Sequence, residues 1–275
     1  FGVGVGAYGA GMFHLMTHAF FKGLLFLGAG SVMHAMSGEL DMRKMGGLRR
    51  RIPVTFWVFV PATLAIAGLP GFSGFFSKDE ILWQAYSSPH GHFLLWLVGA
   101  IAAGMTAFYM FRLLFMTFFG ESRASEEVRK HIHESPKVMT IPMGVLAALS
   151  IIGGYVGIPH VFFRGFNKIG EFLEPVVGGH GGGPSGHASL SLGSLAHAAE
   201  EGGAHATAHG VSPASTELML MAISVAIAAI GIFIAYVFYI KRPELPGILA
   251  EKRKTLYRVL INKYFMDEIY EFCFV

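Results

Sequence analysis

The chain has 275 residues, of which 53% are hydrophobic and 14% are charged, and its mean hydropathy is +0.53. Soluble domains average about 25% charged residues, so this composition argues against a soluble domain and indicates a membrane protein. The net charge of +3 comes from basic residues that lie between apolar runs, a pattern that argues against nucleic-acid binding. The single cysteine, Cys273, excludes an iron–sulfur cluster, a thiolate zinc site or an internal disulfide built from this chain alone.

Five apolar stretches are long enough to span a hydrocarbon core of about 30 Å, which takes roughly 20 helical residues. They comprise residues 7–36, 53–87, 93–119, 138–158 and 217–240. The second is too long for one straight span, and the segment GLPGFSGF interrupts it with proline and glycine. The sequence therefore predicts an all-α, polytopic membrane helix bundle with a broken transmembrane helix.

The connections between these stretches alternate in basic residues. Lys and Arg gather at 43–51, 120–137 and 241–254, whereas 87–92 has none and 159–216 has only two. Because short cytoplasmic loops are rich in Lys and Arg, the first span is predicted to run from the outside to the cytoplasm, and the C-terminal tail to be cytoplasmic.

Two segments are predicted to lie outside the spans. Residues 159–175 mix aromatic and charged side chains, which favours a short interfacial helix. Residues 178–210 are rich in Gly, Ala, Ser and His without an apolar period, which favours an external loop with solvated histidines. The chain starts at Phe1 without an initiator methionine or a signal peptide and ends in an apolar run, so we expect an internal piece of a longer protein.

The motif HLMTHAFFK places ionisable residues every four positions inside the first span. This spacing puts His14, His18 and Lys22 within about 80° of one helix face, about 6 Å apart along the axis. A charge at the bilayer centre costs about 2.5–3.5 kcal/mol, so the face should look into a bundle or a hydrated cavity. Such a row, bridged by water, can carry protons. A purely structural role is the alternative, and a metal site is disfavoured because position 15 is leucine where an HExxH motif has glutamate.

The second motif is GLPGFSGFFSKDE at 68–80. Ser77 and Glu80 have capping-box spacing, which predicts that the broken helix restarts there with Lys78 and Asp79 in its first turn. Discontinuous helices at membrane depth line protein or water and form ion sites in transporters. The alternative is that 53–69 is a complete short span and Lys78 belongs to an external interfacial loop.

Two further features have simpler explanations. GVGAYG at 4–9 matches GxGxxG by letter, but a dinucleotide site needs a preceding strand, so helix packing through small residues or a loose entry loop is favoured. Arg112 lies near the cytoplasmic end of the third span, where its side chain is expected to extend towards the membrane surface.

Together these motifs resemble the C-terminal half of the antiporter-like subunit L (ND5-type) family of respiratory complex I, the proton-pumping NADH:quinone oxidoreductase. The resemblance rests on HLMTHAFFKGLLFLGAGSVMHA at 14–35, DMRKMGGL at 41–48, GLPGFSGFFSKDEIL at 68–82 and FYMFRLLFMTFFGE at 108–121. NKYFMDEIYEFCFV at 262–275 is similar to the approach to the family's long lateral helix. The resemblance is strongest over 1–121, weaker over 138–175 and the last span, and absent over 178–210.

The resemblance implies part of an inverted-repeat antiporter-like fold. Residues 1–121 correspond to proton-translocating helices, including the broken helix 53–87. Residues 122–240 correspond to C-terminal transmembrane helices with the external loop 178–210, and 241–275 to a cytoplasmic tail leading towards a lateral helix.

The resemblance also implies roles for individual residues. His14 and His18 match relays of a central hydrophilic axis, and Lys22 matches its central lysine. Lys78 and Asp79 match the terminal lysine and its neighbouring carboxylate near the outward exit. Protons would move between these groups through bound water, driven by quinone reduction elsewhere in the complex.

The implied partners are the other membrane subunits of complex I, especially neighbouring antiporter-like subunits, and the lipid bilayer of the bacterial inner (plasma) membrane. The chain itself is expected to hold no cofactor and no metal; NADH, FMN, iron–sulfur clusters and quinone would bind partner subunits. Two related alternatives are the large subunit of a multisubunit cation/proton antiporter and the membrane subunit of an energy-converting hydrogenase. A structural membrane subunit without a proton path is the alternative from a different class.

Overall fold

The computed structural model describes residues 1–159, 161–162, 167–177 and 213–274. Within these ranges the chain is helical, with one isolated bridge between Gly157 and Asn167, so the prediction of an all-α bundle is confirmed. The longer helices are α1 (Tyr8–Ala35), α2 (Pro53–Ala67), α3 (Ser73–Ser87), α4 (Phe93–Phe118), α6 (Lys137–Ile152) and α9 (Pro213–Tyr236). The shorter elements are η1 (Val3–Val5), η2 (Met42–Lys44), η3 (Leu48–Arg50), α5 (Glu126–His131), α7 (Lys168–Val177), η4 (Val237–Lys241), α10 (Leu245–Lys252), α11 (Lys254–Ile261), η5 (Lys263–Phe265) and α12 (Met266–Phe274).

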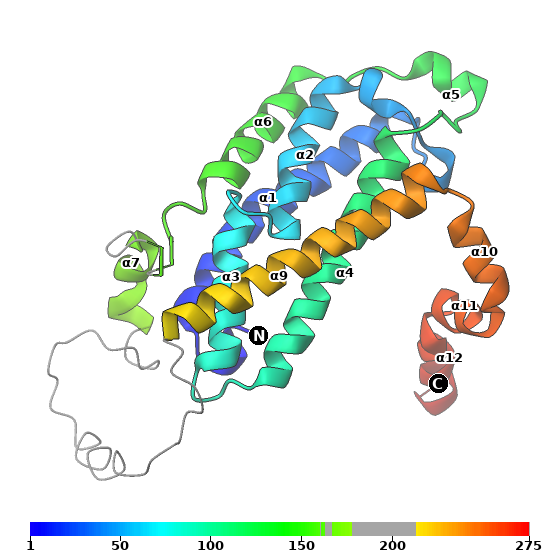
Figure 1. The fold of residues 1–275 in the computed structure, drawn as a ribbon. Coiled ribbons are helices and arrows are strands. Elements are labelled where there is room, and N and C mark those ends of the chain that lie inside the picture. The colour runs from blue at the N-terminus through cyan, green and yellow to red at the C-terminus, as the bar shows by residue number, and fades with distance from the viewer. Residues whose placement is uncertain (160, 163–166, 178–212, 275) are drawn as a thin grey trace, which may run out of the picture.

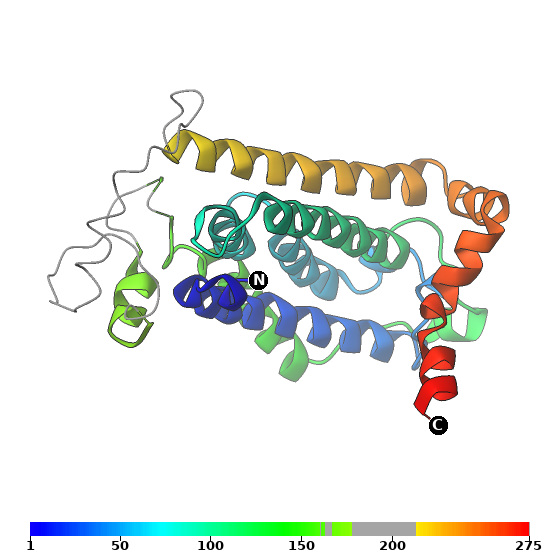
Figure 2. The same cartoon turned by 90° about the horizontal axis from the view of Figure 1, so that it is seen from below.

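The long helices pack as a bundle (Figures 1 and 2). α1 contacts α2, α3 and α6, and α9 runs along α4. Among the described residues, three helices are long and apolar enough to cross a membrane: Tyr8–Ala35, Phe93–Phe118 and Ala214–Lys241. α2 and α6 are apolar but shorter. The bundle is centred on large side chains that are almost fully buried, including Phe21, Leu24, Phe59 and Phe118.

Small residues let α4 and α9 approach closely. A Cβ placed on Gly231 would lie 2.5 Å from the Gly104 carbonyl oxygen, and one on Gly104 would lie 2.6 Å from Ile227 Cγ2. In lipid, where burial of apolar surface does not drive helices together, such close backbone packing is a main source of association. This contact fixes α9 against the helices that carry the candidate site.

The broken helix is present, with its interruption at residues 68–72. Gly68 adopts the left-handed conformation (φ 78°) that ends α2, and its N–H donates to carbonyl oxygens of the last turn. α3 then begins at Ser73, with Phe72 as its N-cap. The predicted restart at Ser77 is wrong, because the turn lets the chain re-enter a helix four residues earlier. Ser77 therefore lies inside α3, and its side chain is available to a neighbouring helix.

The two halves of the broken helix touch through backbone. Gly74, in the first turn of α3, faces the Ala65 carbonyl so closely that any Cβ would clash with it, and the Phe21 ring lies 3.4 Å from the same position. Glycine is therefore required at position 74 for α3 to start beside the end of α2.

A polar cluster, in which Ser31, Thr55 and Ser135 are buried, fixes the other end of α2. The Glu134 carboxylate, just before α6, accepts hydrogen bonds from the Val54 and Thr55 N–H groups at 2.7 and 3.2 Å. The Ser31 hydroxyl lies 2.6 Å from the Thr55 hydroxyl and 2.7 Å from that of Ser135. Because the first N–H groups of a helix have no partner within it, Glu134 acts as a cap supplied from a distant part of the chain.

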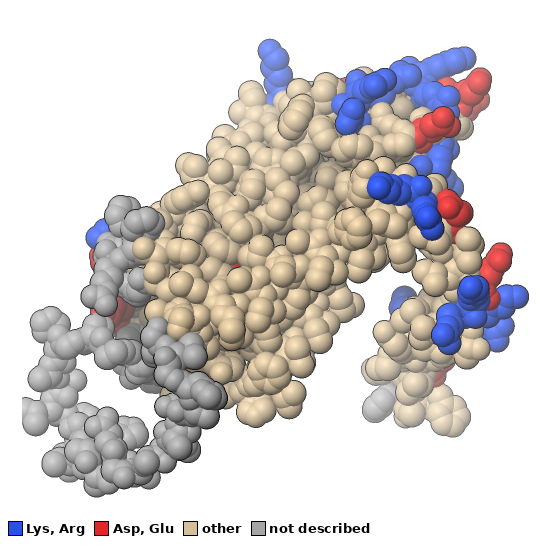
Figure 3. All heavy atoms as spheres, in the orientation of Figure 1, with Lys and Arg blue, Asp and Glu red and all other residues tan. Residues whose placement is uncertain are grey.

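Lys and Arg gather at one end of the bundle, around α5 and α10 (Figure 3). We call this the basic end. The surface of the long helices on the same face is nearly uncharged. Two exposed ion pairs lie there, Arg43–Asp41 at 2.7 Å and Lys44–Glu39 at 2.8 Å. Hydrogen bonds from Arg43 lower the pKa of Asp41 to about 2. Such an accumulation is typical of the cytoplasmic side, so the basic end is predicted to be cytoplasmic and the end formed by α7 and the start of α9 to face the other side.

Three further expectations can be compared with the structure. The helix expected within 159–175 corresponds to α7, which begins at Lys168, ends at Val177 and contacts α1. Residues 4–9 lead through η1 directly into α1, as expected of an entry segment. The segment 178–210 lies outside the described residues.

The substitution Gly74→Ala tests the close contact between α2 and α3. We expect a loss of about 1–3 kcal/mol of stability, because the added methyl group clashes with the Ala65 carbonyl and forces the helices apart. The thermal unfolding temperature of the purified protein in detergent measures this loss. Gly144→Ala in α6, where a Cβ meets no described atom within 4 Å, is the matched control and should leave that temperature unchanged or raise it. Equal behaviour of the two variants would contradict the proposed packing.

Candidate functional site

A cavity of about 210 Å³ lies between the first four long helices. At about 10–15 Å³ per water centre, it has room for several water molecules. Four of the five residues singled out from the sequence line it, namely His14, His18, Lys22 and Lys78. The remaining lining residues are Phe21, Ala65, Ile66, Gly74, Thr106 and Tyr109. We call this cavity the central groove.

The row of ionisable side chains on α1 forms one wall of the groove. The rings of His14 and His18 lie 5.9 Å apart between centroids, as the four-residue spacing predicts. Lys22 continues the row, with its Nζ atom 5.7 Å from the Phe26 ring centroid. In the part of the chain that the structure describes, Lys22 makes no ion pair within 4 Å. Its charge therefore faces the groove without a carboxylate partner from these residues.

Ser77 connects α3 to this row. Its hydroxyl shares a 3.0 Å hydrogen bond with His14 Nδ1 and a 2.8 Å hydrogen bond with the Thr17 hydroxyl. Ser77 and Thr17 are fully buried, so these polar atoms satisfy one another without water. Sequence reasoning did not single out Thr17; the available signal was a hydroxyl one turn from His14 on the polar face of the span.

Lys78 is held by the break in the helix. Its amino group donates a 3.3 Å hydrogen bond to the carbonyl oxygen of Ile66, in the last turn of α2. The last carbonyl groups of a helix have no partner within it and carry its negative partial charge, so the end of α2 favours a cation. A Cβ placed on Gly68 would lie 3.3 Å from Lys78 Cδ. The lysine side chain thus passes close to Gly68, and this packing keeps the amine at its position. Lys78 therefore lies within α3 and not in an external loop.

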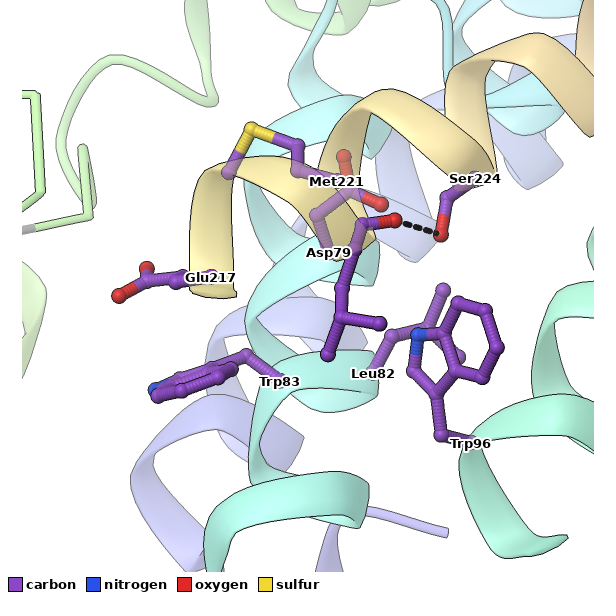
Figure 4. A pocket seen from close by; sticks show the side chains of 8 residues that line it. Asp79, Leu82, Trp83, Trp96, Glu217, Met221 and Ser224 are labelled. Carbon is purple, nitrogen blue, oxygen red and sulfur yellow. Dashed lines mark hydrogen bonds between the residues drawn. The ribbon is translucent and has the colours of Figure 1, made fainter. Parts of the chain in front are cut away.

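Asp79 follows Lys78 in sequence but faces a different space. It lines a small cavity between α3, α4 and α9, together with Leu82, Trp83, Trp96, Glu217, Leu220, Met221 and Ser224 (Figure 4). Successive helix positions differ in direction by about 100°, which separates the two side chains, and they make no ion pair within 4 Å. The structure thus brings together four of the five predicted residues and places Asp79 on another side of the same helix.

Arg112 lies at the basic end of α4, outside both cavities. Its guanidinium carbon is 5.6 Å from the centroid of the Tyr239 ring in η4, a π-helical turn that follows α9. This cation–π contact ties α4 to α9. Within the described ranges, no three His, Cys, Asp or Glu side chains are grouped closely enough to hold a metal ion.

The segment that carries these residues is similar to a known protein family. Residues 1–106 match the family described as the transmembrane family of NADH:quinone oxidoreductase and Mrp antiporters. The matched segment contains α1, the broken helix α2–α3 and all five predicted site residues.

Relatives extend the similarity beyond the family segment. The chain is 40% identical to NAD(P)H-quinone oxidoreductase chain 5 of a Picosynechococcus species, over 99% of this chain and 40% of the relative. It is 38% identical to NADH-quinone oxidoreductase subunit L of Rhodobacter capsulatus, over 99% of this chain and 42% of that protein. The chain thus spans about two fifths of the length of these relatives. The resemblance to subunit L inferred from the motifs is confirmed.

A solved structure supports the fold. The Mrp complex from Dietzia sp. DQ12-45-1b contains a chain that matches with a TM-score of 0.53 and 23% identity, over 92% of this chain and 25% of that one. At this identity the match establishes shared architecture. An antiporter-like membrane fold is therefore common to both.

The substitution Ser77→Ala tests the hydrogen-bond link between α1 and α3. We expect a loss of about 1–3 kcal/mol, because the buried Thr17 hydroxyl and His14 Nδ1 lose a partner. Ser87→Ala at the exposed end of α3 is the control and should stay within about 0.5 kcal/mol of the parent. Thermal unfolding in detergent compares them. A Ser77→Ala variant as stable as the control would show that the link contributes nothing.

Proposed function

We propose that the protein is a subunit of NADH:quinone oxidoreductase and moves protons across the membrane through the central groove. The observation that supports this most strongly is the gathering of His14, His18, Lys22 and Lys78 on one cavity large enough for water. Ionisable side chains within a membrane bundle are costly and mark ion or proton pathways. The relatives' names supply the reaction that would drive transport, because both are quinone oxidoreductase subunits.

The groove supports a mechanism in which protons move between fixed groups through water. His14 and His18 act as relays because imidazole exchanges protons near neutral pH, and Lys22 is the central proton carrier. Lys78 is the terminal carrier, and the Ile66 carbonyl stabilises its protonated form. Because both lysines line one cavity, a proton on one raises the cost of a proton on the other. This repulsion couples the protonation of Lys22 to the deprotonation of Lys78.

The rest of the assembly follows from the same proposal. Neighbouring antiporter-like subunits flank the chain in the inner (plasma) membrane of a bacterium, and the segment 241–275 leads towards a lateral helix. NADH, FMN, the iron–sulfur clusters and quinone bind partner subunits, so this chain contributes the proton path to an enzyme whose redox chemistry occurs elsewhere. Residues 1–121 carry that path, and the helices of 122–240 complete the bundle around it.

Cation/proton antiport is the second candidate function. The fold match to a chain of the Mrp complex favours it, and the same groove lined by lysine and histidine suits exchange of a proton for another cation. The identities of 40% and 38% to quinone oxidoreductase subunits favour the first candidate.

Lys22→Ala tests the proposed function. In the assembled complex in liposomes, we expect proton pumping through this subunit to be lost, because removal of a positioned acid–base group slows proton transfer about 10²–10⁴-fold. Acidification inside the liposomes, measured per NADH oxidised with a pH-sensitive dye, reports the loss. Lys44→Ala removes the same charge from the exposed basic end and should pump normally.

Two outcomes would contradict the proposal. Unchanged pumping per NADH in a fully assembled Lys22→Ala complex would favour a structural subunit without a proton path. Sodium uptake that an imposed pH gradient drives without NADH, and that a protonophore abolishes, would favour the antiporter.

A further inference from the structure

A buried chain of hydrogen bonds lies behind the first histidine of the central groove. Ser77 Oγ is 3.0 Å from His14 Nδ1 and 2.8 Å from the Thr17 hydroxyl, which in turn is 3.1 Å from the His14 carbonyl oxygen. Thr17 and Ser77 are fully buried, and neither is among the residues that line the groove. The chain therefore meets the His14 ring outside the groove.

The number of available hydrogens sets the direction of these three bonds. A hydroxyl group has one hydrogen to donate, and a carbonyl oxygen can only accept. Three contacts need three hydrogens, of which Thr17 and Ser77 supply two. The third comes from His14 Nδ1. Thr17 thus donates to the His14 carbonyl oxygen, Ser77 donates to Thr17, and His14 Nδ1 donates to Ser77.

A fourth contact leads to the same assignment. The Ser73 carbonyl oxygen lies 3.4 Å from Ser77 Oγ, farther than the other partners of that hydroxyl. If the Ser77 hydrogen pointed to it, Thr17 would donate to Ser77, and His14 Nδ1 would still donate to the second lone pair of Ser77. In both arrangements Nδ1 carries a hydrogen, so a neutral His14 ring has its free lone pair on Nε2.

Nε2 is the ring nitrogen left to face the groove. His14 lines the groove, and among the residues that the structure describes its Nδ1 atom is the ring nitrogen with a hydrogen-bond partner. A neutral imidazole takes up a proton at the nitrogen that carries no hydrogen. Since Nδ1 is held as a donor, water in the groove can protonate the ring at Nε2.

The chain behind His14 offers no second exit for a proton. It ends at the His14 carbonyl oxygen, and a backbone carbonyl accepts a hydrogen bond without taking up a proton near neutral pH. A proton that left Nδ1 by way of Ser77 and Thr17 would therefore find no acceptor at the end of the chain.

We propose that Thr17 and Ser77 are positioning residues that hold His14 with a hydrogen on Nδ1, so that His14 exchanges protons with the groove through Nε2 alone. This proposal rests on the proposed function. In the uptake step an O–H bond of a protonated water breaks and an N–H bond forms at Nε2, which leaves a neutral water and an imidazolium. Release to the next water reverses these changes at the same nitrogen. The Nδ1–H bond stays intact throughout, and no other reactant is needed.

Nuclear magnetic resonance of the ring nitrogens tests the assignment. In the complete protein in liposomes, labelled with ¹⁵N-histidine and held at a pH where the ring is neutral, we expect His14 to carry its hydrogen on Nδ1 and none on Nε2. The chain has 13 histidines, so comparison with a His14→Gln variant identifies the signal. A His14 ring with its hydrogen on Nε2 would overturn the proposal. This result does not depend on the folding of any Thr17 or Ser77 variant.

Thr17→Val removes the hydroxyl and keeps the shape of the side chain. Ser77 then loses its nearest acceptor and can donate to His14 Nδ1 instead. The ratio of the Nδ1–H form to the Nε2–H form should fall at least about fivefold, as expected for the loss of one neutral hydrogen bond. Proton pumping in liposomes should fall severalfold, because the nitrogen that faces the groove no longer accepts a proton.

Two further variants separate this role from packing. Thr17→Ser keeps the hydroxyl and should retain both the Nδ1–H form and proton pumping. Thr63→Val removes a buried hydroxyl that donates to the Phe59 carbonyl oxygen within α2, and it should pump normally. Normal pumping by an assembled Thr17→Val complex, or equal losses in Thr17→Val and Thr17→Ser, would contradict the proposal. Loss of pumping in Lys22→Ala together with a His14 hydrogen on Nε2 would reject this inference and leave the proposed function standing.

Discussion

The central constraint on this structure is that a helix interrupted inside a membrane must satisfy its free ends. α2 stops at Ala67 within the bundle, and hydrocarbon offers no hydrogen bonds to its last carbonyl groups. The chain meets this need locally, with the N–H of Gly68 and the amine of Lys78 bonded to carbonyls of the last turn. The lysine is thus a partner for the helix end and, in the proposed function, also a proton carrier. Gly74 makes this possible, because α3 can begin only where its backbone may touch that of α2.

The same break divides the interior into two compartments. Lys78 turns to the central groove, with the histidines and Lys22, and Asp79 turns to the small cavity against α9. A proton pump must keep its two sides from connecting freely. Under the proposed function, a helix that presents adjacent ionisable residues to separate cavities meets that requirement. The packing of Gly104 against Gly231 holds α9 close enough to α4 to close the second cavity.

The sequence predicted the features that depend on period and polarity. The four-residue spacing of His14, His18 and Lys22 was sufficient to place them on one cavity, and Gly68 with Pro70 was sufficient to locate the break. The start of α3 was not predictable from capping chemistry, because the turn at Gly68 determined where the chain could re-enter a helix. The small cavity was missed because it depends on the packing of α9 beside α3, between residues more than 130 positions apart. The sequence periodicity within α3 or within α9 does not indicate that the two helices are in contact.

The separation of the two compartments is tested most directly by a map of the complete complex that resolves ordered water. The account predicts water in the central groove in contact with Lys22 and Lys78, and the Lys78 amine bonded to the Ile66 carbonyl. A direct ion pair between Lys78 and Asp79, or a dry central groove, would contradict it.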